Sequence, residues 1–208
     1  MFAGIWPLTV VAGFQTLNAN VDVLSLGALT DQSHVGIYRV AWQPAFILAT
    51  AVAAMQVALQ PRIAKLYAEG RTAELQHMLV VGSRGMLAAV SLPALALILA
   101  GEQIVVWAFG PAYGPGSVAL AILACGQLAA AAAGANLHVL NMTPYARDAV
   151  VGLAGGLFVN LLLCLLLIPR LETAGAALAS AISLMTLQAF LAWRVRRRTG
   201  LASTALGL

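Results

Sequence analysis

Between Ala149 and Ile168 the sequence reads AVVGLAGGLFVNLLLCLLLI, a run without a single charged residue. A bilayer core about 30 Å thick is crossed by roughly 20 helical residues, and the run has this length. Backbone groups in lipid must find hydrogen-bond partners within the protein, so a spanning segment is an α-helix or a strand of a closed barrel. The run shows no alternation of apolar and polar residues, which favours a transmembrane helix.

Comparable apolar runs recur along the chain, which is 62% apolar and only 9% charged. Soluble domains are nearer 45–50% apolar and about 25% charged. We therefore predict an all-α fold, a polytopic membrane helix bundle of about six transmembrane helices that forms a single domain. The predicted spans cover residues 5–29, 36–60, 79–107, 117–140, 147–168 and 174–194. Residues 61–78 mix apolar and charged side chains and predict an amphipathic cytoplasmic linker lying on the membrane.

Basic residues indicate the orientation of these spans. If the spans alternate in direction, only Arg39 and Arg170 fall on one side. The other side receives Arg62, Lys65, Arg71, Arg84, Arg147, Arg194, Arg196, Arg197 and Arg198. The positive-inside rule makes the second side cytoplasmic, and an even number of spans places both termini there. The net charge of +4 comes from these clusters, so we expect the lipid bilayer and no nucleic acid as a partner.

Polar side chains at membrane depth cost several kcal/mol unless they find partners, so they indicate where a cavity or a network lies. Gln15, Asn18, Asp22 and Ser25 follow one another at spacings of three, four and three residues, which places them on one helical stripe. Two interpretations remain open. The stripe forms either a cation or proton site centred on Asp22, or a hydrogen-bond network between helices.

The second and fifth predicted spans carry further polar groups. Arg39 and Gln43 are one helical turn apart, as are Gln56 and Gln60. Arg39 either binds an anionic headgroup or extends to the outer interface. A pair between Asp22 and Arg39 would lower the burial cost of both. The candidate cavity-lining residues for substrate or ion are Gln15, Asn18, Asp22, Arg39, Gln43, Gln56 and Asn160.

Motifs for catalysis are missing from the sequence. It contains no phosphate-binding Gly-Lys-Ser/Thr loop, no HExxH and no GxSxG, and its three histidines fall in separate segments. We therefore predict that the protein is not an enzyme and expect no cofactor and no metal site.

The order of several short motifs resembles a known transporter family. The motifs are NANVDVLSLG at 18–27, VGIYRVA at 35–41, Pro61 at the start of the linker, FGPAY at 109–113, and LIP at 167–169 followed by GAA at 175–177. Together they resemble the carboxy-terminal half of a polysaccharide (oligosaccharide-lipid) flippase. Such flippases belong to the multidrug/oligosaccharidyl-lipid/polysaccharide exporter superfamily.

This resemblance implies a multi-pass protein of the bacterial inner membrane. It would move polyprenyl-pyrophosphate-linked oligosaccharide by alternating access, for the assembly of lipopolysaccharide or exopolysaccharide. It also implies two similar halves around a central cavity, with Asp22 and Arg39 on cavity-lining helices. Because the chain has about half the expected length, a missing amino-terminal half or a second copy would complete the path. The alternatives are a multidrug or small-solute exporter of the same superfamily, or a truncated membrane protein that transports nothing.

Overall fold

The computed structural model describes the backbone of residues 2–205 and the side chains of residues 13–205. Within this part the chain is helical and has no strand, which confirms the predicted all-α membrane bundle. The elements are α1 (Phe2–Leu29), α2 (Gln32–Ala68), α3 (Thr72–Leu99), α4 (Gly101–Phe109), the 3₁₀ helix η1 (Pro111–Tyr113), α5 (Gly116–Ala133), α6 (Asn136–Asn141) and α7 (Ala146–Thr199).

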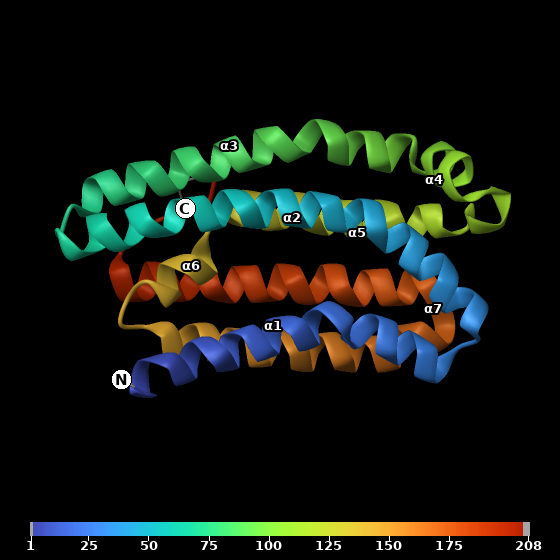
Figure 1. The fold of residues 1–208 in the computed structure, drawn as a ribbon, viewed down its shortest axis with the longest axis horizontal. Coiled ribbons are helices and arrows are strands. Elements are labelled where there is room, and N and C mark those ends of the chain that lie inside the picture. The colour runs from blue at the N-terminus through green and yellow to red at the C-terminus, as the bar shows by residue number, and fades with distance from the viewer. Residues whose placement is uncertain (1, 206–208) are drawn as a thin grey trace.

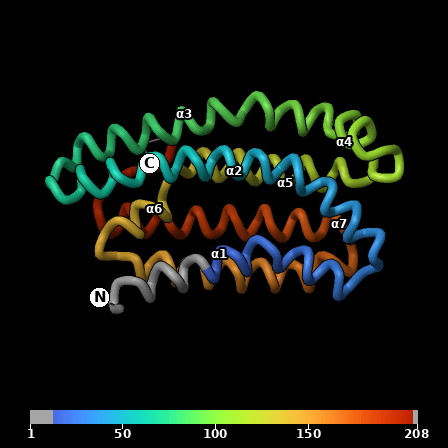
Figure 2. Tube along the Cα trace, in the orientation of Figure 1, coloured from blue at the N-terminus to red at the C-terminus, as the bar shows by residue number. Residues whose placement is uncertain are grey.

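The long helices lie side by side along one axis, as Figures 1 and 2 show. Helix α3 forms one edge of the bundle, and α1 forms the opposite edge together with the first part of α7. Helices α2, α5 and the last part of α7 lie between these edges. Four described helices, α2, α3, α5 and α7, are long and apolar enough to cross a membrane.

Helix α7 contains two antiparallel arms that meet at Glu172, where the backbone leaves the helical region with φ 51° and ψ −122°. The arms, residues 146–171 and 173–199, run in opposite directions in Figure 1. Pro169 lies just before this bend and removes one helical hydrogen bond there. With α1, α2, α3 and α5, the two arms make six long rods in the described part of the chain.

Large apolar side chains point outward as well as inward. Leu92 and Leu99 are each 79% exposed, and Phe158 is 67% exposed. Exposed apolar surface of this extent is expected where lipid, not water, surrounds the bundle. Small residues bring the rods together inside it: a side-chain carbon at Gly126 of α5 would lie only 3.3 Å from the Cβ of Ala181 on α7.

Residues 61–78 differ from the predicted linker on the membrane surface. Helix α2 continues through Pro61 to Ala68, and α3 begins at Thr72, so this stretch forms the two ends of a helical hairpin. Its apolar face lies in the protein core, where Ile63 is fully buried against a cluster that includes Leu75 and Leu79. Packing against neighbouring helices thus compensates for the hydrogen bond that Pro61 removes.

Two other predicted spans are interrupted in the structure. Within 79–107, α3 ends at Leu99 and α4 begins at Gly101. Within 117–140, α5 ends at Ala133 and the short helix α6 begins at Asn136. Gly134 between them has φ +86°, a conformation that a helix cannot continue and that favours glycine. Apolar composition alone does not reveal such breaks, because both sides of each break are apolar.

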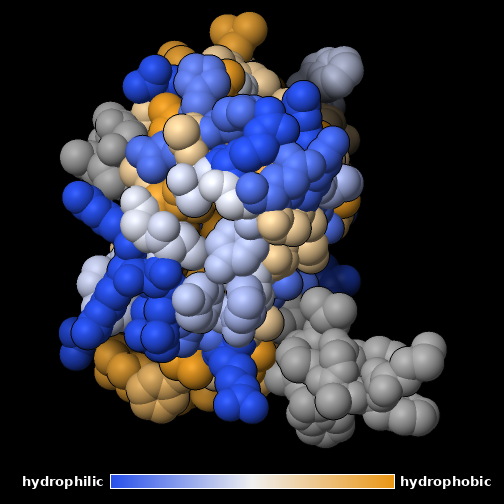
Figure 3. All heavy atoms as spheres, turned by 90° about the vertical axis from the view of Figure 1, so that its left-hand side faces the viewer, coloured by the Kyte–Doolittle hydropathy of each residue, from blue (hydrophilic) through white to orange (hydrophobic). Residues whose placement is uncertain are grey.

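The rods bring most basic side chains to one end of the bundle, which we call the basic end. This end contains the α2–α3 turn, the start of α7 and the end of α7, and Figure 3 shows hydrophilic side chains gathered over it. In the turn, Glu74 and then Glu69 bond to Arg71 and raise the pKa of its guanidinium. The opposite end carries the α1–α2 turn, α4, η1 and the bend of α7.

Candidate functional site

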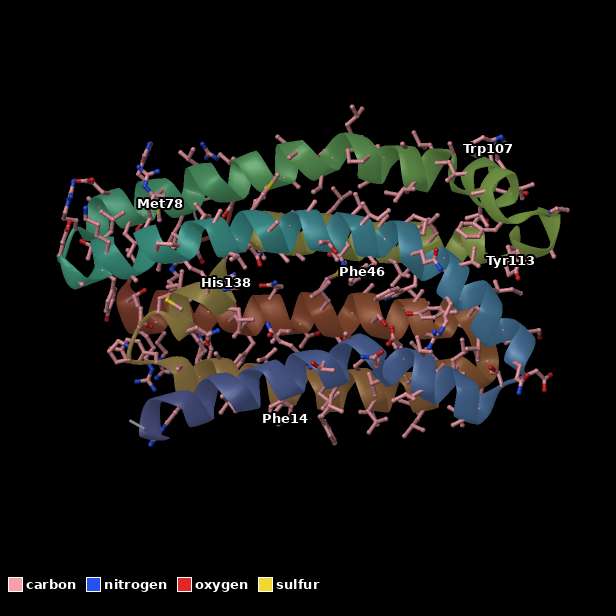
Figure 4. The ribbon with its side chains drawn as sticks, in the orientation of Figure 1. Phe14, Phe46, Met78, Trp107, Tyr113 and His138 are labelled. Atoms are coloured by element: carbon pink, nitrogen blue, oxygen red, sulfur yellow. The ribbon has the colours of Figure 1, made fainter. Side chains whose placement is uncertain are left out.

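A cavity of about 260 Å³ lies inside the bundle between α1, α2, α5 and the arms of α7. Its walls are mostly apolar, with Trp42, Phe46 and Leu184 among them. Figure 4 shows Phe46 near the middle of the bundle's length, away from His138 and Met78 toward the basic end and from Trp107 and Tyr113 at the other end. The polar groups at the cavity are Asn18, Asp22, Gln127, Asn160, Ser180 and Ser183.

Asp22 is the one charged residue among the described residues that line this cavity, and it is only 3% exposed. Two hydroxyl groups donate to the same carboxylate oxygen, Oδ2: Tyr38 Oη at 2.5 Å and Ser180 Oγ at 2.8 Å. Tyr38 comes from α2 and Ser180 from the second arm of α7, so the carboxylate of α1 connects three elements. Hydrogen bonds to a charged acceptor are among the stronger ones in proteins.

The other oxygen of this carboxylate, Oδ1, is buried and accepts no hydrogen bond from the described part of the chain. A buried polar atom in a native structure nearly always has a partner, and an exception calls for an explanation. Among the side chains that the structure describes, no Lys or Arg lines the cavity to neutralise the carboxylate. The free oxygen is therefore suited to hold a proton or a small cation.

Asn18 and Asn160 line the same cavity as Asp22. The side-chain amide of Asn18 donates to the carbonyl of Leu153 on the first arm of α7 at 3.2 Å, and to that of Phe14 on its own helix at the same distance. Asn160 is buried on that arm, where its Oδ1 accepts from the thiol of Cys164 at 3.5 Å. Three of the seven predicted site residues, Asn18, Asp22 and Asn160, thus lie at one cavity.

Arg39 and Gln43 lie elsewhere. They line a second hollow of about 170 Å³ together with Asn20 and Trp42, on the outer side of α1 and α2. Arg39 is exposed and forms no ion pair with Asp22, because its neighbour Tyr38 occupies that position. Consecutive residues on a helix point about 100° apart, so only one of the two can face the core.

The remaining two predicted residues are not at either hollow. Gln15 is exposed on α1. Gln56 donates from its side-chain amide to the carbonyl of Gly134 at 3.0 Å and so ties α2 to the break between α5 and α6. Its role in the described structure is to satisfy a carbonyl that the end of a helix leaves unpaired.

The site contains groups that the sequence does not single out as site residues. Tyr38 and Ser180 hold Asp22, and Gln127 supplies a further amide to the cavity. Ser180 and Gln127 are polar residues within apolar runs, which is a signal that sequence reasoning can use. No comparable signal marks Tyr38, because tyrosine is frequent at membrane interfaces.

Sequence comparisons with known proteins do not assign this chain to a family. No protein-family model matches the chain. A search of curated proteins also finds no match. Any similarity therefore has to be found in the fold.

The fold matches solved transporter structures. A MATE transporter in a bent conformation has a TM-score of 0.76 and 19% identity, over 97% of this chain and 46% of that protein. An outward-facing multidrug resistance transporter of the MATE family, MOP superfamily, gives 0.77 and 18% over 95% and 45%. A MOP superfamily transporter from Pyrococcus furiosus, described by the reverse polarity of its binding pocket, gives 0.76 and 19% over 95% and 45%.

These matches define the class of the fold. The chain is a helical membrane bundle with the fold of part of a MATE-type transporter, and it spans less than half the length of each of the three proteins. All three of these proteins are described as transporters. At 18–19% identity the similarity establishes the fold alone.

Proposed function

We propose that this chain forms about half of a membrane exporter that works by alternating access. In this proposal Asp22 is the site that binds a coupling proton or ion, or a cationic solute. The fold supports this reading, since it is shared with transporters over nearly the whole chain. The observation that carries the proposal is the buried carboxylate of Asp22. One of its oxygens is free, and no basic side chain in the described part of the chain lines its cavity.

The carboxylate of Asp22 is suited to exchange a proton for a cation. Tyr38 and Ser180 hold Oδ2 in place, so Oδ1 remains the only position for a ligand. That position can be occupied by a proton or by a cation, but not by both at once. Competition between the two at a buried carboxylate would couple the movement of one to the other, because binding of either lowers the cost of the buried charge.

The cargo that best fits the cavity is a small organic cation. The apolar walls with Trp42 and Phe46 provide aromatic surface, and cations are attracted to aromatic faces as well as to carboxylates. An anionic pyrophosphate would meet a carboxylate here without any Lys or Arg to offset it. We therefore place the small-solute exporter ahead of the lipid-linked glycan flippase that the sequence resemblance favours.

The flippase remains a second candidate because of one observation. Arg39 is an exposed cation on α2, a helix long and apolar enough to cross a membrane, and it lies in the hollow it shares with Gln43 and Asn20. A charge in this position needs a partner or water, and a pyrophosphate group would supply a partner. This reading requires the outer side of α1 and α2 to face a transport path, formed with a second bundle.

Efflux measurements in cells test both candidates. We expect Asp22→Asn in the native-length protein to lower ethidium efflux at least tenfold, since the amide has no charge to offer a cation. The matched control is Asp31→Asn in the exposed α1–α2 turn, which should leave efflux unchanged. Full efflux in the Asp22 variant would overturn the site. Loss of surface polysaccharide in Arg39→Gln, with ethidium efflux intact, would favour the flippase.

A further inference from the structure

The last two turns of α7, at the basic end, carry a half-exposed indole between two guanidinium groups. Trp193 is 50% exposed. The guanidinium carbon of Arg197 lies 5.3 Å from the centre of the Trp193 ring, and that of Arg194 lies 5.5 Å from it. Both distances are within the range of cation–π contact, so the ring and the two arginines form one unit. We call these three residues the Trp193 cluster.

Asp148 fixes one side of the Trp193 cluster. This carboxylate is buried at the start of α7, where it accepts from Arg194 Nη2 at 2.5 Å and from Arg198 Nε at 3.0 Å. The contacts hold Arg194 in one position, because its guanidinium is also stacked near Phe190 at 5.7 Å. Arg194 is therefore an ordered group and not a freely moving surface side chain.

Positive charge at this place exceeds negative charge. Asp148 is the single carboxylate among five arginines at the two ends of α7: Arg147, Arg194, Arg196, Arg197 and Arg198. Arg197 forms no ion pair with the described part of the chain, and Arg194 Nε is buried there without a hydrogen-bond partner. Of the two guanidinium groups, that of Arg197 is exposed, so the Trp193 cluster presents an unpaired arginine next to an aromatic ring on the outer surface of the bundle.

We propose that the Trp193 cluster binds the phosphate of an anionic phospholipid in the leaflet at the basic end. Tryptophan rings settle at the depth of lipid headgroups, which brings Arg197 to the level of the phosphates. The forked donors of arginine match the oxygens of a phosphate group. The excess positive charge selects a lipid with net negative charge over a zwitterionic one, because each nearby arginine adds attraction to an anionic surface.

The described part of the chain also contains an exposed tryptophan without arginines around it. Trp107 lies at the opposite end of the bundle and is 90% exposed. Among the described residues, no guanidinium lies over its ring. Trp107 therefore provides a matched reporter of ordinary, unselective lipid contact.

Quenching by brominated lipids tests the proposal. A variant with Trp193 as its only tryptophan (Trp6, Trp42 and Trp107→Phe) is reconstituted in phosphatidylcholine vesicles. Dibrominated phosphatidylglycerol or dibrominated phosphatidylcholine is then added at increasing fractions. We expect phosphatidylglycerol to be preferred about fivefold at Trp193, the factor that one arginine contributes near an anionic surface. Arg197→Gln should abolish most of this preference, and high salt should weaken it.

The controls separate a specific site from general charge. Arg170→Gln removes one positive charge at the opposite end and should leave the preference at Trp193 unchanged. A variant with Trp107 alone should show no preference. Equal quenching of Trp193 by both lipids, or an unaltered preference in Arg197→Gln, would overturn the proposal.

A second measurement uses the chain with all its tryptophans. Native mass spectrometry of protein extracted from mixed vesicles should show retained phosphatidylglycerol, with at least one lipid fewer in Arg197→Gln. Retention of equal numbers in both proteins would count against the site. Neither experiment involves transport, so its outcome is independent of the function proposed for Asp22.

Discussion

At the scale of single residues, the partner of Asp22 is Tyr38 and not the adjacent Arg39. Arg39 is the residue whose charge suggests a partner for Asp22, but the hydroxyl of Tyr38 makes the contact at 2.5 Å. A neutral donor leaves the carboxylate able to accept a proton or cation, whereas a fixed guanidinium would have neutralised it. The local chemistry of the cavity thus depends on which of two adjacent side chains faces inward.

Tyr38→Phe isolates the contribution of this hydroxyl. The ring is fully buried and stays in place, while Oδ2 of Asp22 keeps only Ser180 as a side-chain donor. We expect the free energy of unfolding to fall by about 1–3 kcal/mol, the range for hydrogen bonds to charged or buried groups. Unfolding in mixed detergent micelles measures it. Tyr113→Phe makes the same chemical change away from Asp22, and an equal loss there would contradict the prediction.

At the scale of elements, segments from distant parts of the chain pack against the break between α5 and α6 and bond to it. Residues 201–205 fold back against it: Ser83 Oγ donates to the carbonyl of Ser203, and the amide of Ala205 donates to the carbonyl of Ala132. Gln56 adds a bond to the carbonyl of Gly134. These partners satisfy backbone groups that the end of α5 would otherwise leave unpaired inside the bundle.

Gly134→Ala tests how tightly this break is packed. A side-chain carbon at this position would lie 2.3 Å from both the carbonyl oxygen of Ser203 and Oγ of Ser83, and φ is +86°. We expect the variant to lose about 2 kcal/mol or more of stability, because strain and collision act together. Gly85→Ala in α3 meets nothing within 4 Å and should be neutral or slightly stabilising. Thermal unfolding in detergent compares the two, and equal stabilities would refute the packing argument.

At the scale of the whole molecule, the six rods form one bundle whose two described ends lie toward the same end, as Figure 1 shows. The basic residues gather at this end, so the positive-inside rule predicts, as it did from the sequence, that the end is cytoplasmic. The fold extends over less than half of each matching transporter. Under the function proposed above, a transport path between repeats would need a second bundle opposite α1 and α2.

The size of the native protein tests whether a second bundle belongs to the same polypeptide. We expect a tag placed after residue 208 of the chromosomal gene to detect, on a denaturing gel of the membrane fraction, a band of about twice the mass of this chain. The same chain expressed alone provides the size standard. A native band equal to the standard would instead mean that two copies, or a separate partner, form the path; cross-linking from the outer side of α1 and α2 would then identify it.

Much of the architecture follows from the sequence because lipid leaves few choices. Long apolar runs such as 149–168 have to be helical in a membrane. The distribution of arginines predicts which ends of these helices lie on the same side of the membrane. Asn18 and Asp22 of the predicted stripe line one cavity, since a buried carboxylate in a membrane helix has to face protein or a cavity. These inferences depend on composition and helical period, which are properties of the chain itself.

Only the tertiary structure decides which polar groups meet. Tyr38 and Ser180 are separated by 142 residues, yet both donate to one oxygen of Asp22, and residues 201–205 reach the break at Gly134. Helical period gives the direction of a side chain around its own helix but not the neighbour opposite it. That neighbour depends on how the rods pack, which small residues such as Gly126 determine by allowing close approach.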